Sequence, residues 1–394
     1  MKNQFAGVAP PVAVNIAVAV VAGAPAFSNL SSFLFAAWAA GRDKLTFLSR
    51  LMAAMGLFLA LLALPPASAG GLVAFCALTV LARTAWSGIL TVRAAVWRAN
   101  YRRDWRAQVT GRIVQLASLL VAGYAALIGF LMDGSPMAYR PAFVVGALCA
   151  LAAARVYRNA RVRRHRQLLA AELAEQTLEG RRLDPSVFKR VLRGDDDFRH
   201  YMLSMMVFGS GNLMVIPMVV VMLNEQMELS RLYQVMVTSS VPLLVLCFSI
   251  RIWARLLDQR HIFSYRAVHS WFFVASFAVF ALALGLRSPA LLWPASILLG
   301  AAYAGAHLGW NLGHNDFSSD AQASHYMAIH VTFTGLRGLI MPLAGVGFYQ
   351  FLAARWPQQA PLALLLPVSL SLAGSLSFVF LHFARAKRLR EAGS

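Results

Sequence analysis

The stretch Trp-Ala-Ala-Gly-Arg-Asp occupies residues 38–43, and a related stretch, Trp-Ala-Arg-Leu-Leu-Asp, occupies residues 253–258. Each begins with Trp and places Asp five residues later, and the two copies are 215 residues apart. Two weaker pairs keep the same order: Arg-Thr-Ala-Trp at 83–86 with His-Leu-Gly-Trp at 307–310, and Thr-Gly-Arg at 110–112 with Thr-Gly-Leu-Arg at 334–337. Ordered matches at nearly one offset predict two parallel structural repeats.

The composition around these repeats is typical of a membrane protein. Of the 394 residues, 59% are hydrophobic and 13% are charged, against roughly 25% charged in soluble proteins. So few charges cannot cover the surface of soluble domains of this length, which excludes an ordinary soluble enzyme, a disordered chain and a disulfide scaffold. The cysteines Cys76, Cys149 and Cys247 lie far apart in apolar runs. They show no metal-ligand spacing, and neither a metal nor another cofactor is expected.

Eleven apolar segments are long enough to form helices across the hydrocarbon core, which takes about 20 residues. They lie at 12–40, 48–64, 71–97, 113–132, 141–157, 201–223, 231–254, 268–286, 291–313, 325–351 and 361–384. None alternates with a period of two, so we predict an all-α polytopic membrane protein. The predicted domains are a bundle of five spans at 1–157, a cytoplasmic linker with an amphipathic helix at 158–200, and a bundle of six spans at 201–394.

Basic residues are distributed unevenly between the two sets of connections. Counting alternate connections, 29 Lys and Arg residues fall on one side and 5 on the other. Cytoplasmic loops carry this excess, which predicts a cytoplasmic C-terminus and an outside N-terminus in a plasma membrane, the bacterial inner membrane in our interpretation. The net charge of +20 then requires no nucleic-acid partner. We expect the basic linker to contact anionic lipid headgroups, and the protein to be monomeric.

The repeats and the long linker resemble the major facilitator superfamily, whose members have two six-helix halves joined by a cytoplasmic loop. That family carries a Gly/Ala-x-x-x-Asp-Arg/Lys motif after the second helix of each half. This sequence has Ala39-x-x-x-Asp43-Lys44 with Arg50 downstream, and Ala254-x-x-x-Asp258 with Gln259 in place of the base. The resemblance implies that these loops control a switch between conformations. We expect each aspartate to cap a helix end or neutralise a basic group.

The number of predicted spans in the N-terminal half differs from that of the family. The span 12–40 pairs with 231–254, so no segment pairs with 201–223, and residues 1–11 are too short to cross a bilayer. The sequence therefore looks like this fold without its first helix. A start codon placed too far downstream and a genuine eleven-span protein are the two explanations.

Two arginines lie deep within predicted spans, where charged side chains are costly and mark functional sites. Arg83 is in the span 71–97 and Arg337 is in the span 325–351, and no Asp or Glu lies inside any predicted span. Both guanidinium groups are candidates to hold an anionic solute. The alternative is that each bonds to backbone or to a neighbouring amide and only holds helices together.

Other polar residues could line the same binding site. The candidates are His307, Asn311, His330, Asn29 and Asn212. Histidine is the only side chain in this set that titrates near neutral pH, although a lone His in a helix often serves packing. A methionine stripe at 214, 218 and 222 fits apolar packing, and soft-metal transport is a minor alternative.

These features favour a secondary active or facilitative transporter of a small, anionic organic solute that works by alternating access. The alternative is a non-transporting sensor or assembly factor on the same scaffold. The chain contains no nucleotide-binding GxxxxGK[ST] stretch. An enzyme is not expected, because no nucleophile–base pair lies inside the predicted spans.

Overall fold

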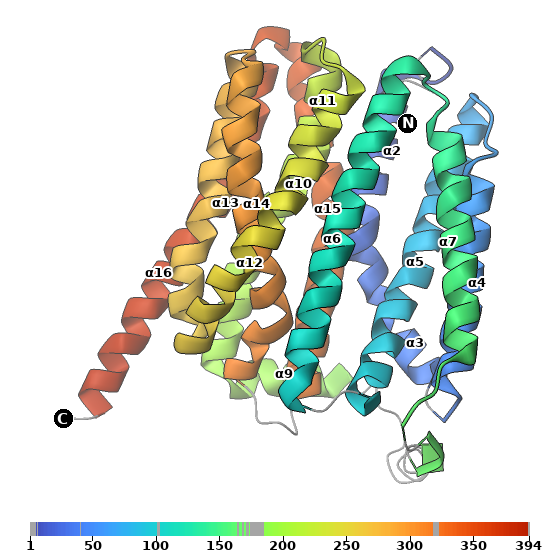
Figure 1. Cartoon of the computed structure of the whole chain (residues 1–394). Helices are drawn as coiled ribbons and strands as arrows, with labels where there is room; N and C mark the ends of the chain where they lie inside the picture. Colours follow the sequence, from blue (N-terminus) through green and yellow to red (C-terminus); the bar gives the residue numbers. More distant parts are fainter. Residues whose placement is uncertain are drawn as a thin grey trace. The chain divides into compact units, whose positions relative to one another are not determined.

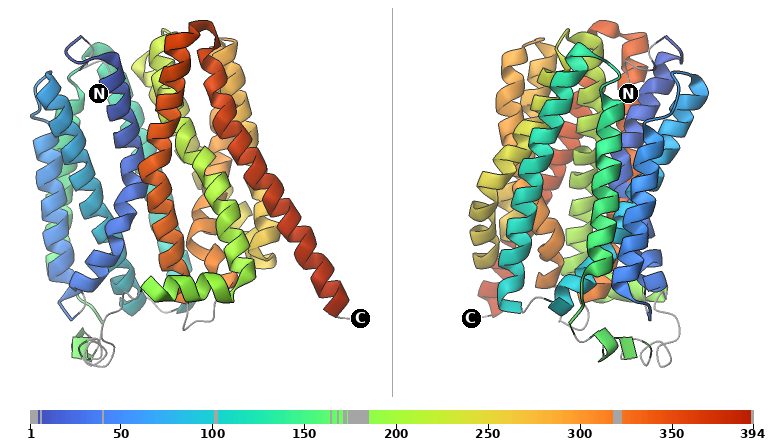
Figure 2. Two further views of the ribbon diagram at one scale, coloured as in Figure 1. Left: turned by 180° about the vertical axis from the view of Figure 1, so that it is seen from behind. Right: turned by 45° about the vertical axis from the view of Figure 1, so that its right-hand side comes forward.

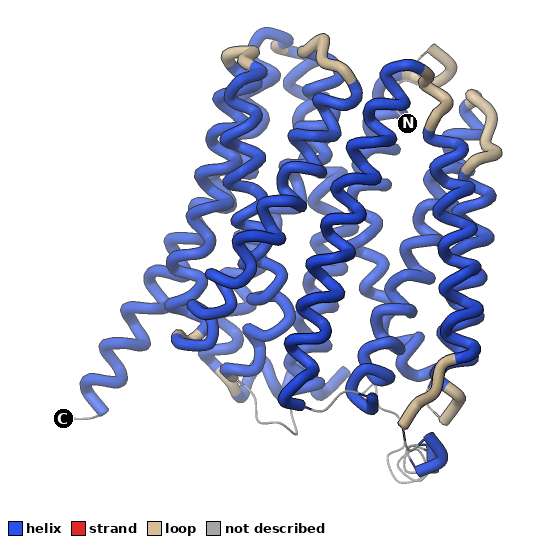
Figure 3. Tube along the Cα trace, in the orientation of Figure 1, coloured by secondary structure: helices blue, strands red, loops and turns tan. Residues whose placement is uncertain are grey.

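The computed structural model describes residues 5, 7–39, 41–100, 103–163, 165–167, 169–170, 173, 185–317 and 323–392. This part of the chain is almost entirely helical and contains no β-strand (Figure 3). Eleven helical segments within it are long and apolar enough to cross a membrane. The predicted all-α, eleven-span class is therefore confirmed.

The chain divides into two compact units. Unit 1 comprises the described residues of 1–116 and 135–185, and unit 2 those of 117–134 and 186–394. The division differs from the predicted bundles in residues 117–134, the second part of one long helix. These residues bond to unit 2, because Asp133 accepts hydrogen bonds from the backbone N–H groups of Arg231 and Leu232, the latter at 3.1 Å.

Unit 1 is built from helices that pack along their lengths (Figure 1). They are α2 (Pro11–Phe27), the 3-10 turn η1 (Ser28–Ser31), α3 (Ser32–Ala39), α4 (Lys44–Leu62), α5 (Ala69–Asn100), the start of α6 (Arg103–Gly134) and α7 (Tyr139–Asn159). Leu48, Ile89, Val92 and Ala154 form a buried core where α4, α5 and α7 meet. Burying these apolar side chains against one another fixes the side of each helix that faces the core.

Unit 2 contains the remaining helices. They are α9 (Pro185–Gly194), α10 (Asp196–Gln226), α11 (Arg231–Val235), the π-helical turn η2 (Met236–Ser240), α12 (Val241–Gln259), α13 (Ile262–Gly285), α14 (Pro289–Leu312), η3 (Gly313–Asp316), α15 (Ala323–Arg355), η4 (Pro357–Leu364) and α16 (Leu365–Ala392). The span formed by α10 is the most buried of all the described spans. It packs against α15 and α16, while α14 packs against α12 and α13.

The predicted span boundaries need one correction that bears on the site. The predicted span 268–286 begins six residues earlier, because α13 starts at Ile262. Arg266, which the basic-residue count placed in a loop, is therefore inside the helix and only 1% exposed. Hydropathy misses this extension because Tyr265 and Arg266 are polar although both are buried.

The linker ends with α9, which lies across the end of α10 (Figure 2), and the described residues 165–167 are also helical. Lys189, Arg190 and Arg193 are exposed, whereas Phe188 and Leu192 are half-buried, so α9 is amphipathic. The surface helix predicted around residues 168–175 lies mostly outside the described residues.

Candidate functional site

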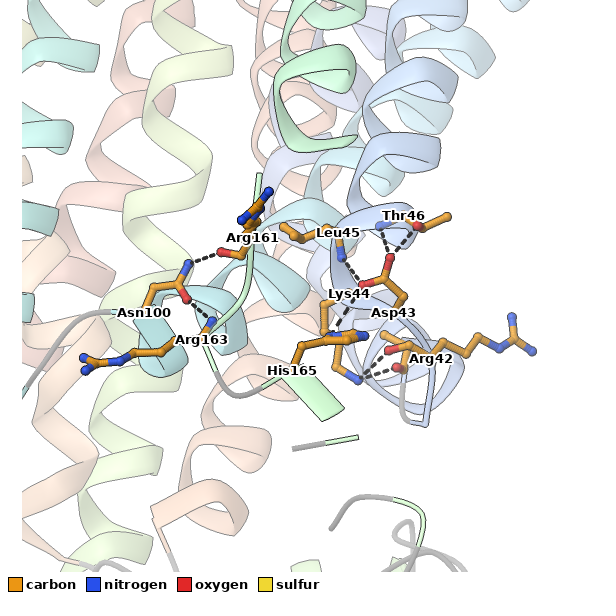
Figure 4. A network of polar contacts seen from close by, with 10 residues as sticks. Arg42, Asp43, Lys44, Leu45, Thr46, Asn100, Arg161, Arg163 and His165 are labelled. Carbon is orange, nitrogen blue, oxygen red and sulfur yellow. Dashed lines mark hydrogen bonds and ion pairs between the residues drawn. The ribbon is translucent and has the colours of Figure 1, made fainter. Parts of the chain in front are cut away.

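The loop between α3 and α4 in unit 1 is held by two adjacent charged residues (Figure 4). Asp43 is the N-cap of α4 and accepts hydrogen bonds from the N–H of Leu45 at 3.3 Å, from the N–H of Thr46 at 3.0 Å and from the Thr46 hydroxyl. The Lys44 ammonium donates to the carbonyl of Ala39 at 2.5 Å. One residue thus caps the start of α4 and the next caps the end of α3.

The surroundings of Asp43 stabilise its charged form. Burial by itself raises the pKa of this carboxyl, but the bonds from Thr46 and Leu45 and the nearby His165 outweigh it and hold the pKa below its ordinary value. The His165 ring lies 3.8 Å from the carboxylate. Arg50, further along α4, is exposed.

The second copy of this loop motif is built differently. Asp258 is exposed in the last turn of α12, and no hydrogen bond or ion pair joins it to another residue that the structure describes. The expected cap or ion pair at Asp258 is therefore not found. The start of α13 is capped instead by Asp316, whose carboxylate accepts from the Ile262 N–H at 2.6 Å, and by His261, whose Nδ1 accepts from the Phe263 N–H at 3.3 Å.

The two arginines predicted at mid-depth lie in different surroundings. Arg83 is in the span Ala69–Arg93, well away from both ends, and is exposed. Arg337 is only 3% exposed. Its guanidinium donates to the carbonyl of Met205 in α10 and to the hydroxyl of Thr334 at 3.1 Å. The described bonds of Arg337 thus tie α15 to α10, whereas the Arg83 side chain is exposed.

The polar candidates on α14 and α15 also differ in burial: those on α14 are exposed and the one on α15 is buried. His307 and Asn311 are exposed on α14, and the Asn311 amide donates to the His307 carbonyl at 2.7 Å. His330 of α15 is completely buried, with the rings of Tyr201 and Trp310 at centroid distances of 6.3 and 5.7 Å. The structure therefore does not bring His330 to the same surface as His307.

The two asparagine candidates lie in different helical surroundings, and only Asn29 is at an interruption of regular α-helix. Asn29 is half-buried in η1, which separates α2 from α3 within one span. Asn212 is half-buried in α10, five residues before Pro217, and its side-chain oxygen accepts a hydrogen bond from the Ser371 hydroxyl at 3.4 Å. Interrupted helices inside membranes expose backbone groups, and such places commonly form solute sites.

The methionine stripe serves packing. Met214, Met218 and Met222 are at most 2% exposed within unit 2. No group of three or more His, Cys, Asp or Glu residues able to hold a metal occurs in the part of the chain that the structure describes. The contacts therefore favour the packing interpretation over the soft-metal alternative.

Sequence reasoning missed a buried polar cluster in unit 2. Arg266 and His269 of α13 are at most 1% exposed and lie against glycines of α14. A side chain at Gly309 would meet the guanidinium of Arg266, and one at Gly305 would meet the ring of His269. The glycines spaced four apart on α14, together with Arg266 and His269 in the segment before and at the start of the predicted span 268–286, were the available sequence signal.

The family model described as the Major Facilitator Superfamily matches residues 6–342. Among solved structures, the chain is similar to a D-xylose–proton symporter, at 14% identity with a TM-score of 0.70, over 96% of this chain and 91% of that one. It is similar to a nucleoside transporter at 13% identity with a TM-score of 0.64, over 97% and 93%. A bacterial homologue of the iron transporter ferroportin gives 13% identity and a TM-score of 0.59, over 96% and 95%. No curated protein sequence gives a match.

Proposed function

Because the chain belongs to the major facilitator superfamily, whose members carry small-molecule solutes across membranes, we propose that it transports a small, anionic organic solute by alternating access. It acts as a secondary active or facilitative transporter and works as a monomer. The observation that carries the anionic part of the proposal is the exposure of Arg83 in the middle of its span.

The depth of Arg83 supports this choice of solute. At 1.5 Å per residue, Arg83 lies at least about 15 Å from either end of the span Ala69–Arg93. An exposed guanidinium at that depth is costly against lipid and is expected to face a polar space. Every Asp and Glu in the described spans lies within two residues of a span end. A carboxylate or phosphate on the solute would therefore supply the balancing charge through charge-assisted hydrogen bonds.

Neutral polar groups would contact the rest of the solute. The candidates are Asn29 in unit 1, half-buried in η1, and in unit 2 the exposed His307 and Asn311 and the half-buried Asn212 of α10. These groups offer both donors and acceptors, as the hydroxyl or amide groups of an organic anion require. Arg337 and His330 are not assigned direct contacts in this conformation, because their side chains are buried within unit 2.

The test measures ligand-induced thermal stabilisation of the purified protein with anionic, neutral and cationic solutes, followed by uptake into proteoliposomes. Arg83→Gln should weaken binding of the stabilising anion by about tenfold or more, and Arg83→Lys by several-fold because the planar fork is lost. Arg155→Gln, at an exposed position on α7, is the matched control and should bind like the wild type.

Stabilisation of the wild type and Arg83→Gln by the same neutral or cationic solute, to the same extent, would contradict the anionic proposal. Binding that depends on Arg83 without uptake in any gradient would favour the non-transporting sensor over the transporter.

The orientation is part of the same proposal, with the C-terminus in the cytoplasm of a bacterial cell and the N-terminus outside. The 29-to-5 distribution of basic residues supports it. In a background without native cysteines, a Cys at Ser394 should resist a membrane-impermeant reagent added to intact cells. A Cys at Ser135, exposed in the connection between α6 and α7, should react. The reverse pattern would overturn this topology.

We also propose that the basic face of α9 contacts anionic lipid headgroups. Lys189, Arg190 and Arg193 are exposed on one side of this helix, and each basic residue near an anionic surface contributes about 1 kcal/mol of attraction. Replacing all three by Gln should remove the extra thermal stability that phosphatidylglycerol nanodiscs give over phosphatidylcholine nanodiscs. An unchanged difference would exclude this contact.

A further inference from the structure

Four large polar side chains are buried together inside unit 2. Tyr201 of α10, Arg266 of α13, and His330 and Arg337 of α15 are each at most 3% exposed. The Tyr201 ring lies 6.3 Å from the His330 ring between centroids, and Arg337 bonds the carbonyl of Met205, one turn after Tyr201 on α10. Arg266 and the Tyr201 hydroxyl lie against Gly309 and Gly313, four residues apart in the chain. The four groups therefore form one cluster contributed by three helices.

The unpartnered atoms of this cluster share one chemical property. The Tyr201 hydroxyl, the Nε of Arg266, the Nε of Arg337 and both ring nitrogens of His330 are buried without a hydrogen-bond partner among the described residues. A guanidinium Nε only donates, a tyrosine hydroxyl can donate or accept, and a neutral imidazole has one donor and one acceptor. These unpartnered groups thus offer four donors but only two acceptor atoms, and a buried donor without an acceptor is costly.

The charge of the cluster is also unbalanced. None of the described salt bridges reaches Arg266 or Arg337. The contacts of His269 indicate that it is neutral: its Nε2 bonds the Ala302 carbonyl at 2.7 Å, so that nitrogen carries the proton, and its Nδ1 accepts from Arg266 at 3.4 Å. His269 therefore orients one guanidinium without compensating its charge. Two positive charges thus remain in a buried region without a carboxylate partner among the residues that the structure describes.

We propose that this cluster binds a small inorganic anion, a halide such as chloride, between Arg266, Arg337, His330 and Tyr201. An anion supplies both an acceptor for several donors and the negative charge that the two guanidinium groups need, whereas a water molecule supplies only the acceptor. A spherical ion also suits a site walled by the rings of Tyr201 and Trp310, because it needs no fixed geometry and no opening to solvent.

This anion is distinct from the transported solute. The solute contacts proposed above are exposed groups headed by Arg83, while the cluster is closed inside unit 2. The expected role is structural, because an anion held between α10, α13 and α15 removes the repulsion between charges on different helices. Loss of the anion should therefore lower the stability of the protein.

The experiment measures thermal unfolding of the detergent-purified protein after exhaustive dialysis into gluconate, with chloride, bromide or sulfate added back. Chloride and bromide should raise the melting temperature of the wild type in a saturable way, as expected for a ligand that binds the folded state, and sulfate should not. Arg266→Gln should weaken the apparent chloride affinity by about tenfold or more. Arg255→Gln, exposed on α12, is the matched control and should respond like the wild type.

Two further measurements keep the proposal falsifiable if Arg266→Gln does not fold. Tyr201→Phe removes a single donor and should weaken the chloride response by several-fold. A crystal prepared in bromide should give an anomalous peak within hydrogen-bond distance of Arg266, Arg337 and Tyr201. A chloride response that is absent from the wild type, or unchanged in Tyr201→Phe, or a bromide structure without that peak, would overturn the anion site while leaving the transport proposal intact.

Discussion

The two copies of the repeated motif, residues 38–43 and 253–258, differ in which end makes contacts: the Asp in the first copy and the Trp in the second. In unit 1, Trp38 is 52% exposed, and Asp43 accepts three hydrogen bonds at the start of α4. In unit 2, Trp253 is 6% exposed and packs against the His269 ring at a centroid distance of 5.0 Å, while Asp258 is exposed without a described partner. The first copy is a polar loop and the second is a packing element.

A single position accounts for this difference. Gly41 has a φ of +66° just after the end of α3, a left-handed conformation that glycine adopts without strain. The equivalent residue in the second copy is Leu256, which disfavours that conformation, and α12 continues to Gln259. Asp258 therefore remains inside a helix, and capping of α13 passes to His261 and Asp316. A repeated sequence motif shows common architecture without showing a common role.

The strongest test of the comparison is removal of the first cap. Asp43→Ala should lower the free energy of unfolding by about 2 kcal/mol, the upper end of the range for an N-cap, because three donors lose one acceptor. Thermal unfolding in detergent measures the change. Asp43→Asn keeps a side-chain oxygen that can cap and should retain most of the stability. A similar loss in both variants would assign the effect to charge and not to capping.

Removal of the Asp316 cap of α13 should lower the free energy of unfolding by less, about 1 kcal/mol. Asp316 accepts only one hydrogen bond there, and His261 also caps α13. The variant Asp316→Ala is compared with Glu228→Ala, an exposed acidic position in the same unit. If both variants lower the free energy of unfolding equally, Asp316 does not stabilise the start of α13, and the conclusion that Asp316 replaces Asp258 as its cap is wrong.

Acid should weaken the cap in unit 2 before the cap in unit 1. Burial, followed by the Arg385 charge, lowers the pKa of His261 below its ordinary 6.5, although Asp316 and Asp197 oppose this shift. The neutral ring is the form that accepts from Phe263. Its stabilising contribution is therefore complete above about pH 6.5 and is lost as the pH falls through the lowered pKa. For Asp43 the loss begins only below about 3.8.

The measurement is the difference in unfolding free energy between the wild type and His261→Asn as the pH is lowered. This difference should shift measurably with pH, by up to about 1 kcal/mol. Asparagine caps without titrating, so the variant should lose less stability than the wild type below about pH 6.5. A difference that does not depend on pH would show that the His261 ring does not cap α13.

Much of the fold could be predicted because membrane spans have a strong sequence signal. The eleven spans follow from hydropathy, and the family follows from the loop motif. The end of α12 and the start of α13 could not be placed in this way, because Asp258 and Arg266 are polar residues in helix. Helix ends depend on caps supplied from elsewhere in the chain, as Asp316 shows.

The candidate site was only partly predictable because the burial of a side chain also depends on residues elsewhere in the chain. The sequence identifies Arg83 and Arg337 as deep charges but does not indicate which side of each helix faces the interior of its unit. That choice depends on the neighbouring helices, since the guanidinium of Arg337 is accommodated by Gly209 of α10. The sequence did not single out Arg266, because this residue falls in the connection between the predicted spans 231–254 and 268–286.

The smallest effect is expected for Asp258, and its contrast with Asp43 is the most direct test of the difference between the two copies of the motif. Asp258→Ala should change the free energy of unfolding by no more than about 0.5 kcal/mol, because the carboxylate is exposed and has no described partner. The same substitution at Asp43 should cost about four times as much. Cysteine accessibility at the ends of α4 and α13 should likewise change in Asp43→Asn and remain unchanged in Asp258→Asn.

A loss of 1 kcal/mol or more in Asp258→Ala would contradict this view. It would mean that Asp258 gains a partner in a second conformation of the transporter, and that the two loops are equivalent over the full cycle. Leu256→Gly distinguishes the causes. If the missing glycine is what keeps Asp258 inside α12, this substitution should fray the last turn of α12 and let Asp258 cap α13, which would make Asp258→Ala costly only in the Leu256→Gly background.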